Sequence, residues 1–268
     1  MTLHPTKNPI LFVGAGPGEP ELITVKGQKA IQSADVIVYA GSLVPESLLN
    51  WAKKKTQNYN SAGMHLKEII DIMATAYLSG KKVVRLHTGD PSLYGAIYEQ
   101  MCALKERHID YQIIPGVTAA FAAAASLKIE YTIPEVTQTL ILTRMSGRTP
   151  VPELENLESL AKHQSSMAIY LSISLVDQVS SILCRTYGDQ SICAVVYKAS
   201  YPDEKIYYMP MEKLSQQVKA LQIKKHALII VGKSIAMQGA DEGHRSKLYD
   251  KNFTHEYRDC DGRNSSET

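Results

Sequence analysis

The chain has 268 residues, of which 44% are hydrophobic and 21% are charged, and its formal net charge is +2. These values are typical of a globular protein with one or two sizeable cores, and they exclude a mainly disordered chain. The nearly balanced charge, with no basic run longer than Lys53–Lys55, argues against a protein that binds along a nucleic-acid backbone.

Strand and helix patterns alternate along the first half of the chain. Short apolar runs predict strands, and apolar residues at helical spacing predict helices. Alternation of this kind favours βαβ units and a largely parallel sheet with helices on both faces. We expect strands at 10–15, 36–40, 82–86 and 111–114, and helices at 24–32, 65–78, 94–105 and 118–126.

The pattern changes after Pro134, where a strand at 139–143 leads into the polar segment RMSGRTPVPELE. A second alternating block follows, in which residues 195–197 and 206–209 predict an antiparallel strand pair around Tyr201-Pro202-Asp203. We therefore expect an α/β fold with two α/β domains, residues 1–135 and 136–240, and a C-terminal tail, 241–268. In the second block we expect strands at 167–171, 192–198, 205–209 and 226–231, and helices at 175–187 and 211–221.

The first strand ends in a glycine turn that fits a dinucleotide site poorly. Gly14 and Gly16 match the first half of G-x-G-x-x-G, but Glu19 stands at the last glycine position. Pro17 also removes a backbone N–H from the turn that would hold a pyrophosphate. NAD is therefore disfavoured, while a tight turn without a ligand stays open as an alternative.

Two later turns, GDP at 89–91 and PGVTA at 115–119, also follow strand ends, where parallel α/β sheets bind their ligands. They are rich in small residues and poor in the lysine or arginine that a polyphosphate requires. This composition favours a flat, weakly charged ligand held mainly by backbone groups. A nucleoside with an amino-acid tail would suit.

Five motifs, in this order and spacing, resemble those of the tetrapyrrole (precorrin) methyltransferases: VGAGPGEPELIT, HTGDPSLYG, IPGVTA, MAIYLS and HALIIVG. The resemblance covers nearly the whole chain. It implies two α/β domains of the tetrapyrrole-methylase type, S-adenosylmethionine bound in the cleft between them, and a homodimer. Two further segments, Leu142–Leu157 and Ser246–Arg258, look like the branch that methylates carbon 11 of precorrin-4, metal-free or cobalt-containing, in cobalamin biosynthesis.

The resemblance also implies a set of donor-binding residues, carried over motif by motif. One position departs from the family pattern, because Leu171 stands where many relatives have methionine. Leucine provides an apolar wall of similar volume, so the departure casts little doubt on donor binding. The set is Pro17, Gly89, Asp90, Leu93, Thr118, Ala119, Leu171, Ala199 and Ala227.

The implied chemistry needs no covalent nucleophile, because the methyl group of the donor is already activated. Positioning of the reacting carbon would supply most of the rate, and a base or water would accept the proton that the macrocycle loses. Asp90 and Tyr94 are the candidate catalytic residues. Asp90 also fits the N-cap of a helix that starts at Pro91, and Tyr94 also fits half-buried packing.

Arg144 and Arg148 are the candidate substrate-binding residues. They flank Gly147 in the polar segment, and guanidinium groups pair bidentately with carboxylates such as those of a precorrin. The residues alone favour a solvated loop, whereas the resemblance implies substrate contact. His87 precedes the second turn, and we expect it in the core without a catalytic role.

Other functions remain open at this point. The same fold is used by enzymes that act on a different precorrin, on ribosomal RNA or on a histidine of a translation factor. A non-catalytic nucleotide-sensing module is a third class.

The four cysteines and eight histidines are dispersed along the chain, with no C-x-x-C pair. We therefore expect reduced thiols and no protein-bound metal. The N-terminal residues lack the pattern of a signal peptide, and no apolar run approaches the ~20 residues that cross a bilayer. We expect a soluble cytoplasmic protein without a nucleic-acid or membrane partner.

Overall fold

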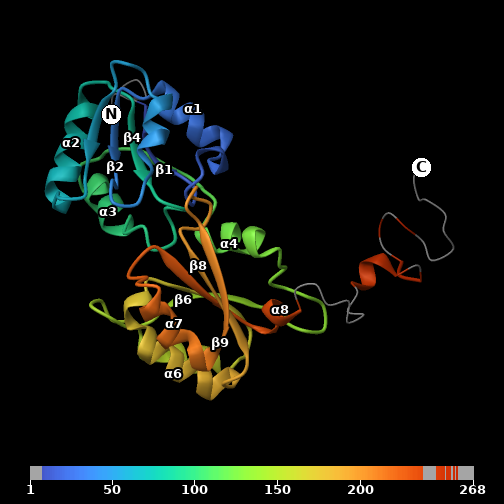
Figure 1. Cartoon of the computed structure of the whole chain (residues 1–268). Coiled ribbons are helices and arrows are strands. Elements are labelled where there is room, and N and C mark those ends of the chain that lie inside the picture. The colour runs from blue at the N-terminus through green and yellow to red at the C-terminus, as the bar shows by residue number, and fades with distance from the viewer. Residues whose placement is uncertain (1–7, 238–245, 251, 255, 257, 259–268) are drawn as a thin grey trace. The chain divides into compact units, whose positions relative to one another are not determined.

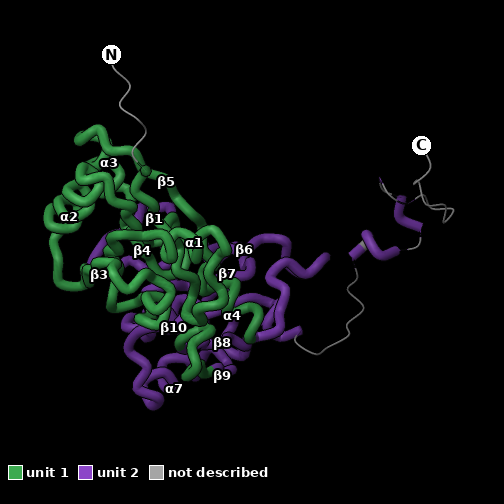
Figure 2. Tube along the Cα trace, turned by 90° about the horizontal axis from the view of Figure 1, so that it is seen from above, with its two compact units in different colours: residues 1–126, 198–205 green, residues 127–197, 206–268 purple. Residues whose placement is uncertain are grey.

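The computed structural model describes residues 8–237, 246–250, 252–254, 256 and 258 (Figure 1). The chain forms two compact units, and Figure 2 shows them in different colours. Unit 1 comprises residues 1–126 and 198–205, and unit 2 comprises residues 127–197 and 206–268. The domain boundaries expected at 135 and 240 stay predictions, and most of the expected tail at 241–268 lies outside the described residues.

Unit 1 is built on a five-stranded sheet with strand order β3-β2-β4-β1-β5, and its strands pair in parallel. Its central strands β1, β2 and β4 are largely buried, because Phe12 and Val83 pack toward α2 and α3 while Val13 and Leu86 pack toward α1. The parallel sheet expected from the alternating pattern is confirmed. Its elements are β1 (Ile10–Gly14), α1 (Val25–Ser33), β2 (Val36–Tyr39), β3 (Gln57–Asn60), α2 (Leu66–Leu78), β4 (Val83–His87), α3 (Tyr98–Glu106), β5 (Tyr111–Ile114) and α4 (Ala119–Leu127).

Local hydrogen bonds fix the first turns of α1 and α2. The Thr24 hydroxyl accepts the Gly27 N–H at 3.1 Å and so caps α1. A capping box starts α2, in which the Glu68 carboxylate accepts the His65 N–H at 2.7 Å. Both helices therefore begin within a residue of the positions that the sequence predicts.

The helix after β4 starts later than expected. Tyr94 and Ala96 have φ values of 56° and 50°, which lie outside the right-handed helical region. Residues 91–97 consequently form turns and irregular backbone, and α3 begins only at Tyr98. The expectation that Asp90 caps a helix starting at Pro91 is therefore wrong.

Unit 2 contains a second five-stranded sheet, in the order β6-β7-β10-β8-β9. It is mixed, because β6 and β7 are parallel while β10 runs antiparallel to both β7 and β8. The α6 residues Val176, Val179 and Leu183 recur on one helical face and enter the core. The expected pairing of 195–197 with 206–209 is confirmed to the extent that β8 and β9 are hydrogen-bonded neighbours. The elements are β6 (Leu140–Arg144), α5 (Leu157–Ala161), β7 (Ser166–Tyr170), α6 (Val176–Tyr187), β8 (Ile192–Tyr197), β9 (Lys205–Pro210), α7 (Leu214–Ala220), β10 (Ala227–Val231) and α8 (Lys233–Ala236).

The order of the strands in unit 1 predicts that a ligand binds at the carboxyl-terminal edge of the sheet, beyond the ends of β1 and β4. The neighbours β1 and β4 are followed by helices that cover opposite faces, α1 on one and α3 on the other. Parallel α/β sheets bind ligands at such a point, beyond the carboxyl ends of the strands. The three glycine turns of the sequence lie at this edge.

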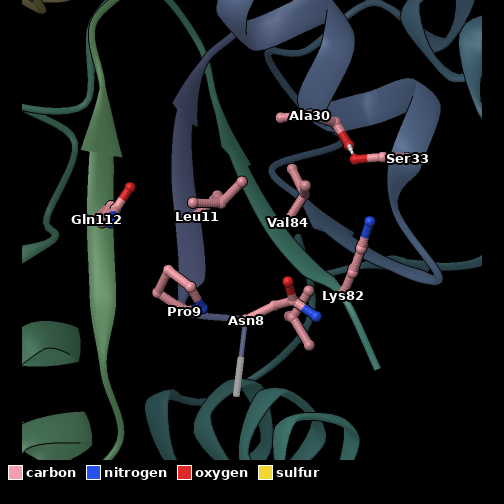
Figure 3. Close-up of a pocket in the computed structure, with 9 residues that line it drawn as sticks. Asn8, Pro9, Leu11, Ala30, Ser33, Lys82, Val84 and Gln112 are labelled. Carbon is pink, nitrogen blue, oxygen red and sulfur yellow. Dashed lines mark hydrogen bonds between the residues drawn. The ribbon is translucent and has the colours of Figure 1, made fainter. Parts of the chain in front are cut away.

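A cavity of about 240 Å³ lies at the opposite edge of the same sheet (Figure 3). Pro9, Lys82 and Gln112 line it: Pro9 and Lys82 directly precede β1 and β4, and Gln112 is the second residue of β5. The cavity is therefore separate from the glycine turns, and none of the candidate residues lines it.

Candidate functional site

The turns after β1, β4 and β5 meet at a junction of glycines. A Cβ atom on Gly116 would lie 2.2 Å from the carbonyl oxygen of Gly89 and 2.8 Å from Cα of Gly14. Gly89 and Gly16 exchange two hydrogen bonds, of 2.8 Å from the Gly89 N–H and 3.3 Å from the Gly16 N–H. Only glycine allows backbones to approach this closely, so the three turns form one continuous backbone surface.

The Asp90 carboxylate ties the second turn to the third. Its Oδ2 accepts the Gly116 N–H at 2.9 Å, and its Oδ1 accepts the Ser92 N–H at 2.8 Å and the Ser92 hydroxyl. Burial alone would raise the pKa of Asp90, but these hydrogen bonds outweigh it and hold the pKa below its usual value. A carboxylate with a low pKa is a weak base, so the geometry makes Asp90 a structural anchor with a negative charge.

The other candidates of unit 1 lie on the same turns or on the segment 198–205. Pro17 follows Gly16 in the first turn and is buried, while Thr118 is buried directly before α4. Ala199 is buried as well, and the hydroxyl of its neighbour Ser200 accepts the Glu19 N–H at 3.0 Å. Unit 1 thus holds Pro17, Gly89, Asp90, Leu93, Thr118, Ala119 and Ala199 of the predicted donor set.

Tyr94 lies beyond Asp90 on the second turn. Tyr94 is 42% exposed, and the turn is tight because a Cβ atom on Gly95 would lie 2.2 Å from the Pro91 carbonyl oxygen. Positive φ values at non-glycine residues such as Tyr94 cluster at binding and active sites. The structure therefore presents Tyr94 at the rim of the turn and not in the core.

The two ionisable residues of β4 point into the core. Arg85 is buried and donates to Gln100 Oε1 at 3.1 Å and to the Ser61 hydroxyl at 3.0 Å. His87 stacks on Phe12 with ring centroids 5.9 Å apart. Burial, assisted by the charge of Arg85, lowers the pKa of His87 to about 3, so this imidazole is neutral at physiological pH. The structure confirms His87 as a core residue.

The candidates of unit 2 gather at one edge of its sheet. The register of β6 and β7 pairs Arg144 with Tyr170, which directly precedes Leu171. Ala227 begins β10 and pairs with Tyr197 at the end of β8. Leu171 is 66% exposed and has a φ of 51°, so its side chain lies at the surface of the unit.

Arg144 and Arg148 have different surroundings. The Arg144 guanidinium donates to the carbonyl oxygens of Thr149 at 2.9 Å and Pro150 at 2.8 Å, and so holds the loop that carries Arg148. The Arg148 side chain is exposed and forms no hydrogen bond or ion pair with any residue that the structure describes. Arg144 organises the loop, whereas the charge of Arg148 is available to a bound molecule.

Sequence reasoning missed Ser172, Ser200 and Tyr201. Ser172 is fully buried; it accepts the Met145 N–H at 2.8 Å and donates to the Tyr170 carbonyl at 2.6 Å. Its hydroxyl joins the Arg144 loop to the Leu171 turn within unit 2. A hydroxyl that bonds to distant backbone leaves no pattern in the sequence, so no signal could have identified these residues.

No helix among the described residues is long and apolar enough to cross a membrane. Within the same residues, no three or more histidine, cysteine, aspartate or glutamate side chains cluster in a way that could hold a metal ion.

Comparisons with known proteins are consistent with these features. Residues 9–215 match the sequence profile of the Tetrapyrrole (Corrin/Porphyrin) Methylases. The chain is 57% identical over 250 residues to the cobalt-precorrin-4 C(11)-methyltransferase of Methanocaldococcus jannaschii, covering 93% of this chain and 95% of that protein. It is 44% identical over 249 residues to the precorrin-4 C(11)-methyltransferase of Pseudomonas aeruginosa, covering 93% of this chain and 98% of that protein. The X-ray structure of a cobalt-precorrin-4 methyltransferase superposes with a TM-score of 0.82 at 47% identity, covering 84% of this chain and 95% of that one.

Proposed function

The chain belongs to the tetrapyrrole (corrin/porphyrin) methylase family, and we propose that it transfers a methyl group from S-adenosylmethionine to carbon 11 of precorrin-4 or cobalt-precorrin-4. This reaction is a step in building the corrin ring of cobalamin. The observation that carries the proposal is the 57% identity, along 93% of the chain, to a relative named for this reaction. The names of the relatives divide between the cobalt and the metal-free substrate, so the proposal covers both.

The turns of unit 1 suit this methyl donor. Residues 14–19, 88–96 and 115–119 contain no lysine or arginine, so they offer backbone groups and the Asp90 carboxylate in place of a cationic phosphate cradle. A sulfonium nucleoside with an amino-acid tail carries positive charge, which an ionised carboxylate attracts. The proposed donor-binding residues are Pro17, Gly89, Asp90, Leu93, Thr118, Ala119, Leu171, Ala199 and Ala227.

The donor supplies a methyl group that is already activated for transfer. The protein's contribution is then orientation of carbon 11 in line with the S–CH₃ bond, an effect that can lower a barrier by about 7–11 kcal/mol. As the new carbon–carbon bond forms, the S–CH₃ bond breaks, S-adenosylhomocysteine is left, and the macrocycle loses a proton. We assign Asp90 to holding the turns and Tyr94 to contact with the substrate, with water accepting the proton because Asp90 is a weak base.

The polar loop of unit 2 supplies the substrate contact in this proposal. The acidic side chains of the macrocycle match the planar guanidinium group of Arg148, which Arg144 holds in place through its bonds to Thr149 and Pro150. The proposal also includes a homodimer, which the family likeness suggests. It further includes a cytoplasmic location and no protein-bound metal, which the dispersed cysteines and histidines suggest.

A direct test combines binding and turnover. Calorimetry should detect one S-adenosylhomocysteine per chain and no NAD binding, and incubation with donor and either precorrin-4 form should yield a methylated macrocycle. Tight NAD binding, or methylation of ribosomal RNA with no reaction on either tetrapyrrole, would overturn the proposal.

A further inference from the structure

The segment 198–205 joins β8 to β9 and belongs to unit 1, where it touches the first glycine turn. Two hydrogen bonds attach it to unit 1: the Glu19 N–H of the first turn donates to the Ser200 hydroxyl at 3.0 Å, and the Tyr201 hydroxyl donates at 2.9 Å to the carbonyl of Leu43, which follows β2. Burial raises the pKa of Tyr201, so its hydroxyl keeps the proton that it donates. The segment is thus attached both to the first glycine turn and to the loop after β2.

The ring of Tyr201 also lies directly against Gly18. A Cβ atom on Gly18 would be 2.2 Å from Cδ2 and 2.4 Å from Cε2 of this ring. Real Cβ atoms do not approach a ring carbon so closely, so the ring fills the space that any side chain at position 18 would need. Gly18 follows Pro17, so the ring restrains the part of the turn that carries this proposed donor-binding residue.

Internal bonds keep the segment itself in a defined shape. The Glu204 carboxylate accepts the Ser200 N–H at 2.6 Å and the Ser126 hydroxyl at 2.9 Å. Lys198 forms an ion pair with Asp203. Two further signs of constraint are the φ values of 51° at Lys198 and 65° at Ser200.

From these contacts we propose that Ser200 and Tyr201 are positioning residues for the methyl donor. Pro17 precedes Gly18, and Ala199 precedes Ser200, so the contacts fix two proposed donor-binding residues from separate segments against each other. Neither Ser200 nor Tyr201 needs to touch the reacting atoms. The inference rests on the proposed function, since it assumes that the donor occupies the first turn.

A double-mutant cycle on Gly18 and Tyr201 tests the proposal, with the dissociation constant of S-adenosylhomocysteine as the readout. Gly18→Ala should weaken binding by about tenfold or more, because the new methyl group displaces the ring, and Tyr201→Ala should weaken it by a similar factor. In the Tyr201→Ala background, Gly18→Ala should cost less than about twofold, because the obstructing ring is gone. Equal costs of Gly18→Ala in both backgrounds would overturn the proposed contact.

Milder variants keep the test valid if Gly18→Ala does not fold. Tyr201→Phe and Ser200→Ala each remove one hydrogen bond. Each should weaken the binding of S-adenosylhomocysteine by about threefold to tenfold. The KM of the tetrapyrrole should stay within about twofold in these variants, because the substrate loop is untouched. Unchanged affinity for S-adenosylhomocysteine in both variants would contradict a positioning role.

Tyr187→Phe is the matched control. The Tyr187 hydroxyl donates to the Ser165 carbonyl at 2.7 Å in unit 2, so the substitution removes the same kind of bond away from the donor turns. It should lower the urea midpoint about as much as Tyr201→Phe and leave donor affinity unchanged. Binding of S-adenosylhomocysteine by the unaltered protein is measured first, and its absence would refute the proposed function. If the unaltered protein binds and the Ser200 and Tyr201 variants bind equally well, only this inference is refuted.

Discussion

Asp90 accepts hydrogen bonds from its own turn and from the turn after β5, so both its charge and its two oxygens contribute to the candidate site. The fold holds the pKa of Asp90 below the ordinary 3.8. The ionised form therefore stabilises the protein at any pH above the unfolded-state value, and this contribution is lost as the pH falls through the lower folded-state pKa.

Asp90→Asn keeps the size of the side chain but removes the charge and one acceptor oxygen. At pH 7 we expect a lower urea midpoint and weaker binding of S-adenosylhomocysteine. The difference in unfolding free energy from the unaltered protein should be constant between about pH 5 and 8 and should narrow below about pH 4. A difference that persists unchanged into that acidic range would mean that the charge of Asp90 does not stabilise the turns.

Substitution of Arg144 and substitution of Arg148 should have different effects. Arg148→Ala should lower kcat/KM for the tetrapyrrole by about 10- to 150-fold, the value of a charge-assisted bond of about 1.5–3 kcal/mol, without changing stability. Arg144→Ala should reach a similar loss and also lower the urea midpoint, since the Thr149 and Pro150 carbonyls lose their donor.

Lysine at either position should restore activity only in part, because an ammonium group lacks the planar fork. The affinity for S-adenosylhomocysteine is the internal control and should stay within about threefold in every variant, since neither arginine is a proposed donor-binding residue and most of those residues lie in unit 1. Normal turnover of precorrin-4 by both alanine variants would make the loop a solvated linker.

The glycine junction between the turns after β1, β4 and β5 leaves no room for a side chain at Gly116. Gly116→Ala should destabilise the protein and weaken the binding of S-adenosylhomocysteine, because the added Cβ atom would lie 2.2 Å from the Gly89 carbonyl oxygen. Gly63→Ala is the control: no atom lies within 4 Å of its added Cβ, and such substitutions commonly stabilise by about 0.4–1 kcal/mol. Urea unfolding and calorimetry of both variants measure the contrast, and equal behaviour would show that the junction tolerates a side chain.

Strong local patterns allowed most elements to be predicted from the sequence. The apolar runs of β1 and β5 and the helical stripe of α2 gave bounds within a residue of the structure. The strand β3 escaped notice because its sequence, Gln57–Asn60, is polar and mostly exposed at a sheet edge, where packing does not select apolar residues. The late start of α3 was also hidden, because it depends on the conformation of Tyr94 and Ala96 and not on composition.

Only those residues of the candidate site that lie in recognisable sequence motifs could be predicted. The glycine turns and Asp90 stand out in the sequence, but their convergence depends on the strand order β4-β1-β5, which brings three distant turns together. The different surroundings of Arg144 and Arg148 arise from backbone carbonyls that any residue would present. Such contacts depend on three-dimensional arrangement and leave no mark on the order of residue types.

For the whole molecule, the low net charge fits a small acidic substrate better than a nucleic acid. A net charge of +2 gives little attraction to a polyanion, whereas one loop with Arg144 and Arg148 is enough for a small acidic macrocycle. The charge of the chain therefore favours a tetrapyrrole over ribosomal RNA as the methyl acceptor.

The position of the transferred methyl group tests the proposed reaction most directly. The protein is incubated with S-adenosylmethionine labelled with carbon-13 at the methyl group and, separately, with precorrin-4 and cobalt-precorrin-4, and the products are analysed by nuclear magnetic resonance. We expect a single labelled methyl group on carbon 11 of at least one of the two substrates. A label on a different carbon, or no label on either tetrapyrrole from protein that binds S-adenosylhomocysteine, would contradict the proposed reaction.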